Sequence, residues 1–433
     1  MATEMHDVIV VGGGFAGLTA AREASLAGAD VLLLEARDRL GGRTWATSWD
    51  GIPIEYGGAW VHWHQPHTWS EITRAGLAVE ISEDAQVAAW YVGGERRLGT
   101  IAERDAIAER GWSRFVEGAA EMLPQPHAPL AAIDRLARLD ALTIAQRMAE
   151  IDLDDEQRAV LTAELESLAH GHLDDAGAVS VLRWHQLSGG SLALTQSTGG
   201  RVTLTGGTGG LLHAIAAGGR FRRQLSTPVA AVVQSAGRVE VHTRAGDVHA
   251  GRSAVVAVPL NALAAIAFDP PLSDGKQAAV TLGQASRGIK IFLRARGQPV
   301  FHNAIRPGHP FGYLDSELLL DDGSQLLIGF GLDQTLLDVT DVDAVRRAAA
   351  EILPGYDVLA ATAHDWLGDE FSQGTWAIHR PGWYVHHHAE MRRPQGRMLL
   401  AGSDLANGWA GFIDGAIESG LGAGRWAAAR ARA

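Results

Sequence analysis

The stretch Asp7-Val8-Ile9-Val10-Val11-Gly12-Gly13-Gly14-Phe15-Ala16-Gly17 decides the fold of the first part of this 433-residue chain. Val8 to Val11 form an unbroken β-branched run, which predicts a strand buried on both faces of a parallel sheet. The glycines that follow have the spacing GxGxxG. We expect Gly12 to allow a tight turn, Gly14 to let the backbone approach a pyrophosphate, and Gly17 to let a helix pack closely on the strand.

The residues after this fingerprint predict the rest of a dinucleotide-binding unit. A helix from about Phe15 to Ala27, with Ala16 in its first turn, would direct free N–H groups at the phosphates. The second strand, Val31 to Leu34, ends at Glu35, whose carboxylate can accept hydrogen bonds from both ribose hydroxyls of an adenosine. This order of strand, turn, helix and strand predicts a bound dinucleotide. It leaves both FAD and NAD open.

The next residues separate these two cofactors. The run Glu35-Ala36-Arg37-Asp38-Arg39-Leu40-Gly41-Gly42-Arg43 resembles the FAD-binding stretch of the flavin amine oxidase family, which is typified by monoamine oxidase. The resemblance implies cofactor contacts at Ala36, Arg37 and Gly42, and a charge-assisted contact of Arg43 with the diphosphate. It also implies the fold class: an α/β, Rossmann-like FAD-binding domain with an inserted mixed α+β substrate domain.

Further motifs continue the resemblance in the order that the family has them. Glu55 to Trp60 resembles the segment beneath the flavin ring, and Gly206 to Leu212 resembles a Gly-Gly turn before a helix. Near the other end of the chain, Ala401-Gly402-Ser403-Asp404 and Gly411-Phe412-Ile413 form a second glycine-rich run. The resemblance implies further cofactor-binding positions at Gly58, Ala59, Trp60, Val229, Trp366, Ser403, Asp404 and Ile413. From its local sequence alone, Asp404 could equally be a helix cap.

These anchors predict a discontinuous FAD domain. We expect it to consist of residues 1–75, 206–280 and 388–433, while residues 76–205 and 281–387 build the substrate domain. Apolar residues recur at helical spacing from Leu142 to Ile151 and from Asp155 to Ala169. Ile289 to Leu293 and Gln325 to Phe330 have strand-like composition.

The absence of cysteine from the sequence bears on how the flavin is held. Mammalian members of the family attach their flavin through a cysteine in a Gly-Cys-Tyr run. The matching run here is Gly374-Thr375-Trp376, so Thr375 stands at the attachment position. We therefore expect noncovalent FAD.

Three residues are the candidate catalytic groups. Lys290 lies between Ile289 and Ile291, and from this strand alone it is either a buried functional lysine or an ordinary edge-strand lysine. Ser286 to Ile289 resembles the family's approach to its flavin lysine, which implies that Lys290 holds a water near flavin N5 and assists the reduction of O2. Trp376 and Phe412 match the two positions of the family's aromatic cage, although aromatic residues are also common in cores.

The remaining pocket candidates are less well defined by the sequence. We expect His62, Leu187 and Tyr313 to line the substrate pocket together with the two cage residues. Histidines cluster at positions 62, 64 and 67 and at 386–388, but adjacent histidines cannot all face one ion from a regular strand, and no carboxylate completes either set. We therefore expect no metal site.

Composition excludes several classes of partner. A hydrophobic fraction of 46% and a charged fraction of 20% are typical of a globular protein, and the length allows two domains. The formal net charge of −13 disfavours nucleic acid and anionic membranes as partners. The start Met1-Ala2-Thr3-Glu4 has no secretion signal and no stretch approaches a membrane span, so we expect a cytoplasmic protein. The sequence leaves a homodimer open.

Together these features predict a flavin-dependent amine oxidase. Tyr56 to His62, His364-Asp365-Trp366 and Gly402-Ser403-Asp404 most resemble the bacterial branch that includes 6-hydroxy-L-nicotine oxidase. That resemblance implies a small, lipophilic amine of the secondary, tertiary or cyclic, alkaloid-like kind. Its α-hydrogen would move as hydride to flavin N5, O2 would be reduced to hydrogen peroxide, and the imine would hydrolyse.

Three alternatives stay open. An L-amino-acid oxidase would need a pocket arginine, for which Arg183 and Arg380 are candidates. A flavin dehydrogenase or desaturase would use another electron acceptor, although Lys290 argues against it. A non-catalytic FAD-binding scaffold is disfavoured by the intact lysine and cage positions.

Overall fold

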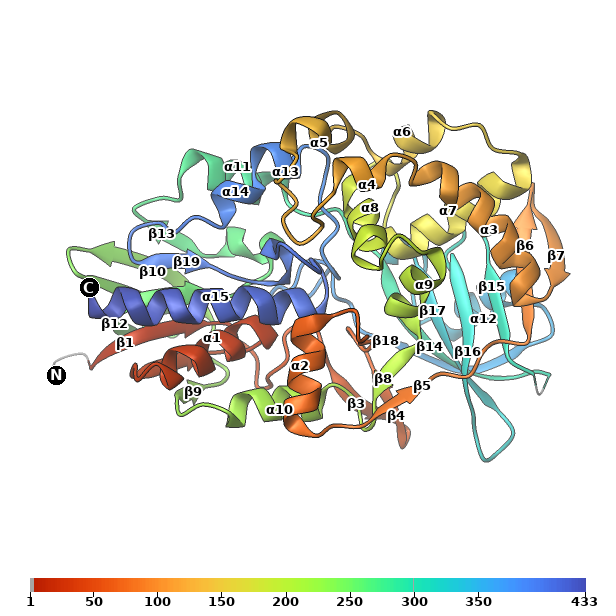
Figure 1. The fold of residues 1–433 in the computed structure, drawn as a ribbon. Helices are drawn as coiled ribbons and strands as arrows, with labels where there is room; N and C mark the ends of the chain where they lie inside the picture. The colour runs from red at the N-terminus through yellow and green to blue at the C-terminus, as the bar shows by residue number, and fades with distance from the viewer. Residues whose placement is uncertain (1–3, 299) are drawn as a thin grey trace.

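Two separate β-sheets organise the protein, and a computed structural model describes them in residues 4–298 and 300–433. The first three residues, on which the expectation about a secretion signal partly rests, lie outside the described part of the chain. Figure 1 shows one sheet at the end that carries the termini and the other at the opposite end. Among the described residues, no helix is both long and apolar enough to cross a membrane.

The first sheet has eight strands, and its central strand carries the glycine fingerprint. The strand order is β13-β10-β11-β12-β1-β2-β9, with β19 also paired to β12. Their bounds are β1 (Met5–Val11), β2 (Val31–Leu34), β9 (Arg222–Gln224), β10 (Val229–Ser235), β11 (Arg238–Thr243), β12 (Val248–Val256), β13 (Ala267–Asp269) and β19 (Met398–Leu400). β1 runs parallel to both neighbours, and Val11 lies beside Leu34 on one side and Val256 on the other. Its valines are fully buried, as a strand covered on both faces requires.

Two helices from opposite ends of the chain pack side by side on this sheet. α1 (Phe15–Leu26) and α15 (Ile413–Arg432) lie against each other in Figure 1. A Cβ atom on Gly420 or Gly424 would lie only 2.4 Å from a carbonyl oxygen of α1, so these glycines permit the close approach. The packing brings the first residues of both helices to the same end of the sheet.

The second sheet has seven strands. Its order is β18-β14-β17-β16-β15-β6-β7, antiparallel except for the parallel pair β15 and β6. The bounds are β6 (Val87–Val92), β7 (Glu95–Gly99), β14 (Ile289–Arg296), β15 (His302–Ile305), β16 (Tyr313–Leu319), β17 (Gln325–Gly331) and β18 (Asp357–Ala363). Ile291 and Leu293 pack beneath α12 (Val342–Ile352) in one apolar cluster. Because side chains alternate along a strand, Lys290 and Phe292 project from the opposite face.

Helices and short strands cover the rest of both sheets. The longer helices are α2 (Pro66–Ala75), α3 (Ile101–Phe115), α5 (Ile133–Asp140), α7 (Asp155–Ala169), α8 (Ala178–Leu187), α9 (Leu192–Gly200), α10 (Gly209–Ala217) and α11 (Asp274–Leu282). The shorter elements are α4 (Ala119–Met122), α6 (Ile144–Ala149), α13 (Trp383–His386), α14 (His388–Met391), β3 (Ala46–Trp49), β4 (Ile52–Glu55), β5 (Val79–Ile81), β8 (Val202–Leu204), and the 3₁₀ turns η1 (Leu260–Ala265), η2 (Gln334–Leu336) and η3 (Ser403–Leu405).

The expected fold class is confirmed. All eight strands of the first sheet come from residues 1–75, 206–280 and 388–433, and all seven of the second come from 76–205 and 281–387. The domain boundaries themselves stay a prediction. α1 and α7 match the expected helices closely, whereas the helix expected over 142–151 is the shorter α6.

Candidate active site

A cavity of about 830 Å³ extends from the carboxyl end of β1 to the face of the seven-stranded sheet that carries Lys290. Most of the residues predicted from the sequence line it: Gly12, Gly14, Phe15, Ala16, Glu35, Ala36, Arg37, Gly42, Arg43, Gly58, Ala59, Trp60, Val229, Lys290, Tyr313, Trp366, Ser403, Trp376, Phe412 and Ile413. The two sheets therefore share one elongated site.

Glycines leave one end of the cavity open. Gly12 has a φ of +104°, and a Cβ atom on Gly17 would lie 1.9 Å from the carbonyl oxygen of Gly12, so Gly17 serves packing and does not line the cavity. Gly14 pairs with Gly41, and a Cβ atom on Gly14 would find its nearest neighbours only at 3.8 Å. No side chain caps α1 at Gly14, so its first N–H groups stay free for phosphate oxygens. This cradle fits a dinucleotide diphosphate.

Glu35 closes the turn beside this cradle. Its buried carboxylate accepts hydrogen bonds from the backbone N–H groups of Gly13 (2.5 Å) and Arg37 (2.8 Å). It also faces the cavity. The residue predicted to bind a ribose therefore also fixes the backbone of the fingerprint.

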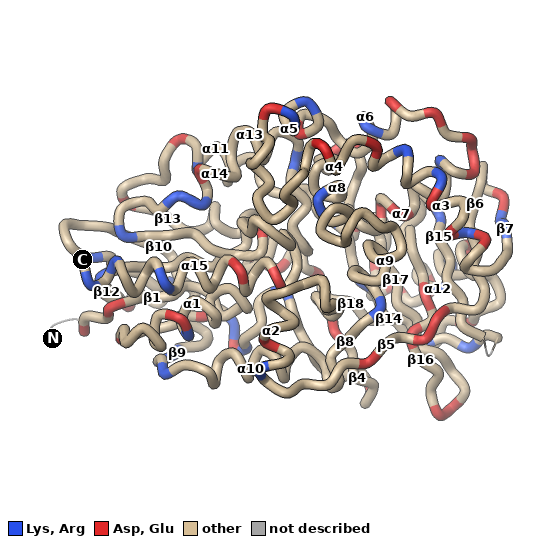
Figure 2. The backbone as a smooth tube through the Cα atoms, in the orientation of Figure 1, with Lys and Arg blue, Asp and Glu red and all other residues tan. Residues whose placement is uncertain are grey.

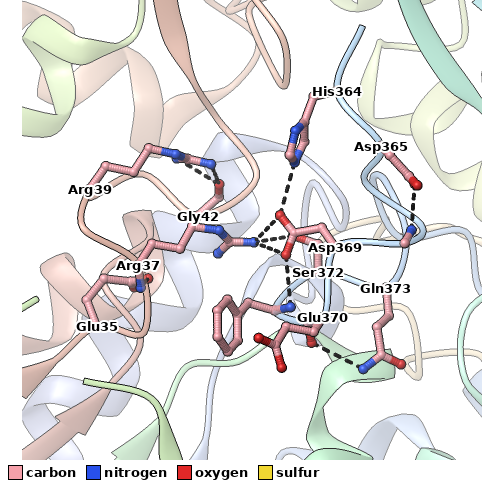
Figure 3. A network of polar contacts seen from close by, with 12 residues as sticks. Glu35, Arg37, Arg39, Gly42, His364, Asp365, Asp369, Glu370, Ser372 and Gln373 are labelled. Atoms are coloured by element: carbon pink, nitrogen blue, oxygen red, sulfur yellow. Dashed lines mark hydrogen bonds and ion pairs between the residues drawn. The ribbon is translucent and has the colours of Figure 1, made fainter. Parts of the chain in front are cut away.

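A polar network ties the segment that carries Trp366 to the nucleotide end. Arg37 donates to both carboxylate oxygens of Asp369 (2.7 Å each) and to Ser372 Oγ (2.8 Å), and His364 Nε2 lies 3.0 Å from the same carboxylate (Figure 3). Burial opposes ionisation of Asp369, but the hydrogen bonds from His364 and Arg37 hold its pKa below the ordinary value. The network joins residues more than 300 positions apart.

Arg43 and Asp404 form a buried pair at the base of the cavity. The guanidinium of Arg43 is ion-paired with Asp404 and also donates to Ser403 Oγ (2.9 Å) and the Thr375 carbonyl (2.8 Å). Asp404 additionally accepts a hydrogen bond from Leu260 N (2.9 Å) and does not line the cavity. The expected direct contact of Asp404 with the cofactor is therefore not supported, because this carboxylate lies behind Arg43 and orients it.

Lys290 is buried and faces the cavity. β14 lies between β17 and β18, so the edge-strand interpretation of this lysine is wrong. Its Nζ donates to the Gly57 carbonyl at 3.1 Å and lies 4.6 Å from the ring centroid of Trp60. Burial lowers the pKa of Lys290 to about 8, opposed by the negative charges of Glu55 and Glu317.

The only other lysine in the sequence serves a different purpose. Lys276 is buried in α11, donates to the Glu390 carbonyl (2.6 Å), and is ion-paired with the carboxylate of the same residue. It does not line the cavity. Of the two buried lysines, Lys290 alone faces the site.

The two cage residues line the cavity and are held by aromatic neighbours. The Trp376 ring stacks on His170, with centroids 4.2 Å apart and an interplanar angle of 7°, and its Nε1 donates to the Leu168 carbonyl at 2.9 Å. Phe412 packs edge-on against Trp184 and Trp409. Both rings are therefore fixed from behind.

His170 was not identified from the sequence. It caps α7 with a φ of +48°, and its Nδ1 lies 2.8 Å from Thr375 Oγ1. Burial lowers the pKa of His170 to about 3, so the ring is neutral. Nothing in the local sequence distinguishes this histidine from the 17 others, and only its distant partner reveals its position.

A second group that the sequence analysis missed forms the polar end of the cavity. It consists of Arg104, Asp105, Glu164, Gln196, Asn303, Asp315 and Glu317. A usable signal was present, because Tyr313, Asp315 and Glu317 alternate along one strand and must share a face.

Two predicted pocket residues lie elsewhere. His62 is fully buried, with Nε2 3.3 Å from Ser197 Oγ, and does not line the cavity. Leu187 packs in an apolar core cluster. Both pocket assignments are therefore wrong. In the described part of the chain, no three His, Cys, Asp or Glu side chains gather in a way that could hold a metal ion.

Comparisons with known proteins agree with this architecture. The family described as "Flavin containing amine oxidoreductase" matches residues 15–425. The chain is 35% identical to pseudooxynicotine dehydrogenase of a Pseudomonas species over 96% of its own length and 84% of the relative's, and 29% identical to (S)-6-hydroxynicotine oxidase of Paenarthrobacter nicotinovorans over 96% and 97%. The solved structure of cyclohexylamine oxidase from Brevibacterium oxydans has a TM-score of 0.80 at 22% identity, covering 99% of this chain and 100% of that one.

The cavity and the family match also identify the cofactor, because the glycine cradle fits a dinucleotide and the family is FAD-dependent. The chain belongs to the flavin-containing amine oxidoreductases.

Proposed function

We propose that this enzyme is an amine oxidase that removes a hydride from the α-carbon of a small amine and uses O2 as the final acceptor. The observation that carries the proposal is that one cavity joins the glycine cradle, the buried Lys290, and the aromatic residues Trp376 and Phe412. FAD, when bound, supplies the hydride acceptor at its N5 atom. The protein supplies binding, orientation and electrostatics.

Trp376 and Phe412 would position the amine. The stack on His170 and the hydrogen bond to Leu168 fix the plane of Trp376, so the ring can orient a substrate without reorganising. An apolar wall also favours the neutral form of a bound amine, since burial disfavours charge. The neutral form is required because the nitrogen lone pair must stabilise the iminium product.

Lys290 would assist the reduction of O2. With a pKa of about 8, the group is still mostly protonated at pH 7. A buried ammonium that is already in place stabilises the negative charge that develops on oxygen. Its hydrogen bond to Gly57 and its position over Trp60 hold it toward the cavity.

The two relatives support an alkaloid-like substrate. Their names specify pseudooxynicotine and (S)-6-hydroxynicotine. By analogy, we propose a secondary, tertiary or cyclic amine whose imine product hydrolyses or stays cyclic. Noncovalent attachment of FAD, a cytoplasmic location and a homodimer stay predictions.

The amino-acid oxidase alternative is weakened by the positions of its two candidate arginines. Arg183 is bound to Tyr384 and to main-chain carbonyls, Arg380 is paired with Asp175, and neither lines the cavity. Arg104 does line it, but Glu164, Asp315 and Glu317 surround the same region and would repel a substrate carboxylate.

A dehydrogenase is the second candidate function, because the relative at 35% identity is named as one. Anaerobic mixing with a panel of N-methylated and cyclic amines should bleach the flavin. Oxygen should then restore its colour and release one peroxide for each amine oxidised. Reoxidation that is much faster with an artificial one-electron acceptor than with O2 would favour the dehydrogenase. A panel that never bleaches the flavin would refute amine oxidation by either route.

A further inference from the structure

The cavity end beyond the aromatic cage is lined by acidic side chains from β16 and α7. Tyr313, Asp315 and Glu317 project from the same face of β16, and Glu164 on α7 faces the same space. Arg104 of α3 is the one arginine among the described residues in this group. Figure 2 shows further acidic residues on the segment that follows β5, whose residues 82–85 also line the cavity, and Asp84 of this segment is ion-paired with Arg201.

The positive charges nearby are already engaged. The guanidinium of Arg104 donates to Asp105 (2.8 Å) and is hydrogen-bonded to Asn303. The ammonium of Lys290 is hydrogen-bonded to the Gly57 carbonyl. In the described part of the chain, neither Arg104 nor Lys290 donates a hydrogen bond to Glu164 or Asp315.

Two carboxylate oxygens of this acidic group have no hydrogen-bond partner among the described residues. Asp315 Oδ2 accepts a hydrogen bond from the Tyr313 hydroxyl (2.9 Å), and Glu164 Oε1 accepts one from Gln196 (3.1 Å). Asp315 Oδ1 and Glu164 Oε2 are buried and accept none from the described residues. Buried acceptors without donors are costly, so these two oxygens favour a cation or a hydrogen-bond donor in the adjoining space.

Burial decides the ionisation of these acids. It raises the pKa of Glu164 and of Asp315 to about 7, although the positive charge of Arg104 opposes the shift, and it raises the pKa of Glu317 against the charge of Lys290. Arg104 and Lys290 therefore do not fully compensate the burial of these acids. A nearby positive charge would draw them into the ionised form.

The path from the cage to these acids is apolar. The ring centroids of Trp376 and Phe330 are 6.1 Å apart, and those of Phe330 and Tyr313 are 5.9 Å apart. The Tyr313 hydroxyl then donates a hydrogen bond to the Asp315 carboxylate. A ligand that spans this path needs a hydrocarbon middle, and its far group would lie on the order of 10 Å from the cage, about two strand spacings across the sheet.

We propose that the substrate carries a second, permanently positive group, which Asp315, Glu317 and Glu164 bind while the reacting amine lies neutral between Trp376 and Phe412. This inference rests on the proposed function and changes its substrate class. The proposed substrate is then an amine with an apolar middle and a cationic group at the end far from the reacting nitrogen.

A matched pair of substrates tests the far charge. One carries CH3NH at one end and a trimethylammonium at the other, joined by seven methylenes, and its partner has a tert-butyl group in place of the trimethylammonium. The two far groups have nearly the same shape and differ in charge. We expect kcat/KM for the cationic member to exceed that of its neutral partner by ~10-fold or more.

Variants assign the effect to the carboxylates. Asp315→Asn and Glu164→Gln should each bring the ratio of the two kcat/KM values toward one, mainly through KM for the cationic member. Glu166→Gln is the matched control, because Glu166 is on the same helix, accepts a hydrogen bond from Gly308 N and does not line the cavity. It should leave the ratio unchanged. A ratio near one in the parent enzyme, or a ratio that survives both cavity variants, overturns the proposal.

A binding measurement separates this proposal from amine oxidation. An analogue that is a primary amine on a fully substituted α-carbon, with no N-methyl group, has no α-hydrogen to lose as hydride, so calorimetric titration of the holoenzyme reports binding alone. The cationic analogue should bind ~10-fold or more tightly than its tert-butyl partner. If that preference holds while no amine reduces the flavin, the acidic subsite stands and the proposed oxidation fails. Equal affinities overturn the subsite whatever the activity.

Discussion

Replacing Lys290 by methionine should leave the protein at least as stable and make it a poorer oxidase. Lowering the pKa of Lys290 from its ordinary 10.5 to about 8 corresponds to a cost of about 3 kcal/mol for keeping the ammonium buried at neutral pH. Methionine has similar length and no charge, so it removes this cost, while the hydrogen bond to Gly57 is lost. We expect Lys290→Met to leave the free energy of unfolding unchanged or raise it by up to about 3 kcal/mol at pH 7 in urea titrations.

The pH dependence of this gain has a defined sign. Below about pH 8 the lysine is protonated in both the folded and the unfolded protein, so the full cost is present. Between about 8 and 10.5 only the unfolded chain keeps the proton, and the cost disappears as the pH rises. The stability difference between Lys290→Met and the parent should therefore shrink across this range. In the parent, the rate of flavin reoxidation by O2 should fall as the pH rises through about 8.

Lys276→Met is the control, since it removes the other buried lysine. That lysine donates to the Glu390 carbonyl and is ion-paired with the Glu390 carboxylate, so its replacement removes both contacts and should destabilise the protein. Reoxidation by O2 should slow by at least ~10²-fold in Lys290→Met, the effect of one preorganised group at a developing anion, and stay unchanged in Lys276→Met. A clear loss of stability in Lys290→Met with normal reoxidation would refute the functional reading of this residue.

Three further predictions concern the cofactor and the cage. Acid precipitation should release FAD into the supernatant, because Thr375 stands at the attachment position and is hydrogen-bonded to His170; flavin left in the pellet would contradict noncovalent binding. Trp376→Ala should slow anaerobic flavin reduction ~10²-fold by loosening the substrate's position, whereas the effect of Phe412→Tyr should be far milder. In the parent enzyme the rate of flavin reduction should rise with pH to a plateau, with an apparent pKa below that of the free amine. Equal rates for Trp376→Ala and the parent would place the substrate elsewhere. His170→Ala should slow reduction more than Thr375→Val, because it removes the ring stacked on Trp376; the reverse order would show that the hydrogen bond, not the stack, positions the cage.

The nucleotide end of the site could be predicted because its signals are local. The run Val8 to Val11, the turn at Gly12 and the helix from Phe15 follow one another in sequence, and each residue's role depends on its immediate neighbours. Glu35 was found for the same reason, at the end of the next strand. Such motifs identify residues well but do not fix their partners. Asp404 was expected to contact the cofactor, yet its carboxylate is ion-paired with Arg43.

The substrate end depends on contacts between distant segments. His170 meets Thr375 across 205 positions, and no pattern around either residue predicts that meeting. The acids of β16 were different, since their alternation was readable, but which face of the strand looks into the cavity depends on the neighbouring strands. His62 and Leu187 were assigned by their order in the chain, and burial in the core overrode that order.

The positions of the two lysines bear on how the enzyme tolerates its own chemistry. Lys276 and Lys290 are the only lysines in the sequence and both are buried, so the side chains present no primary amine to solvent. Carbonyl compounds, which form when an imine hydrolyses, condense with exposed amines and gradually modify proteins that carry them. Arginine provides the other basic side chains of this chain, and its guanidinium stays protonated and unreactive under the same conditions. An enzyme built this way can release aldehydes or ketones without consuming its own surface.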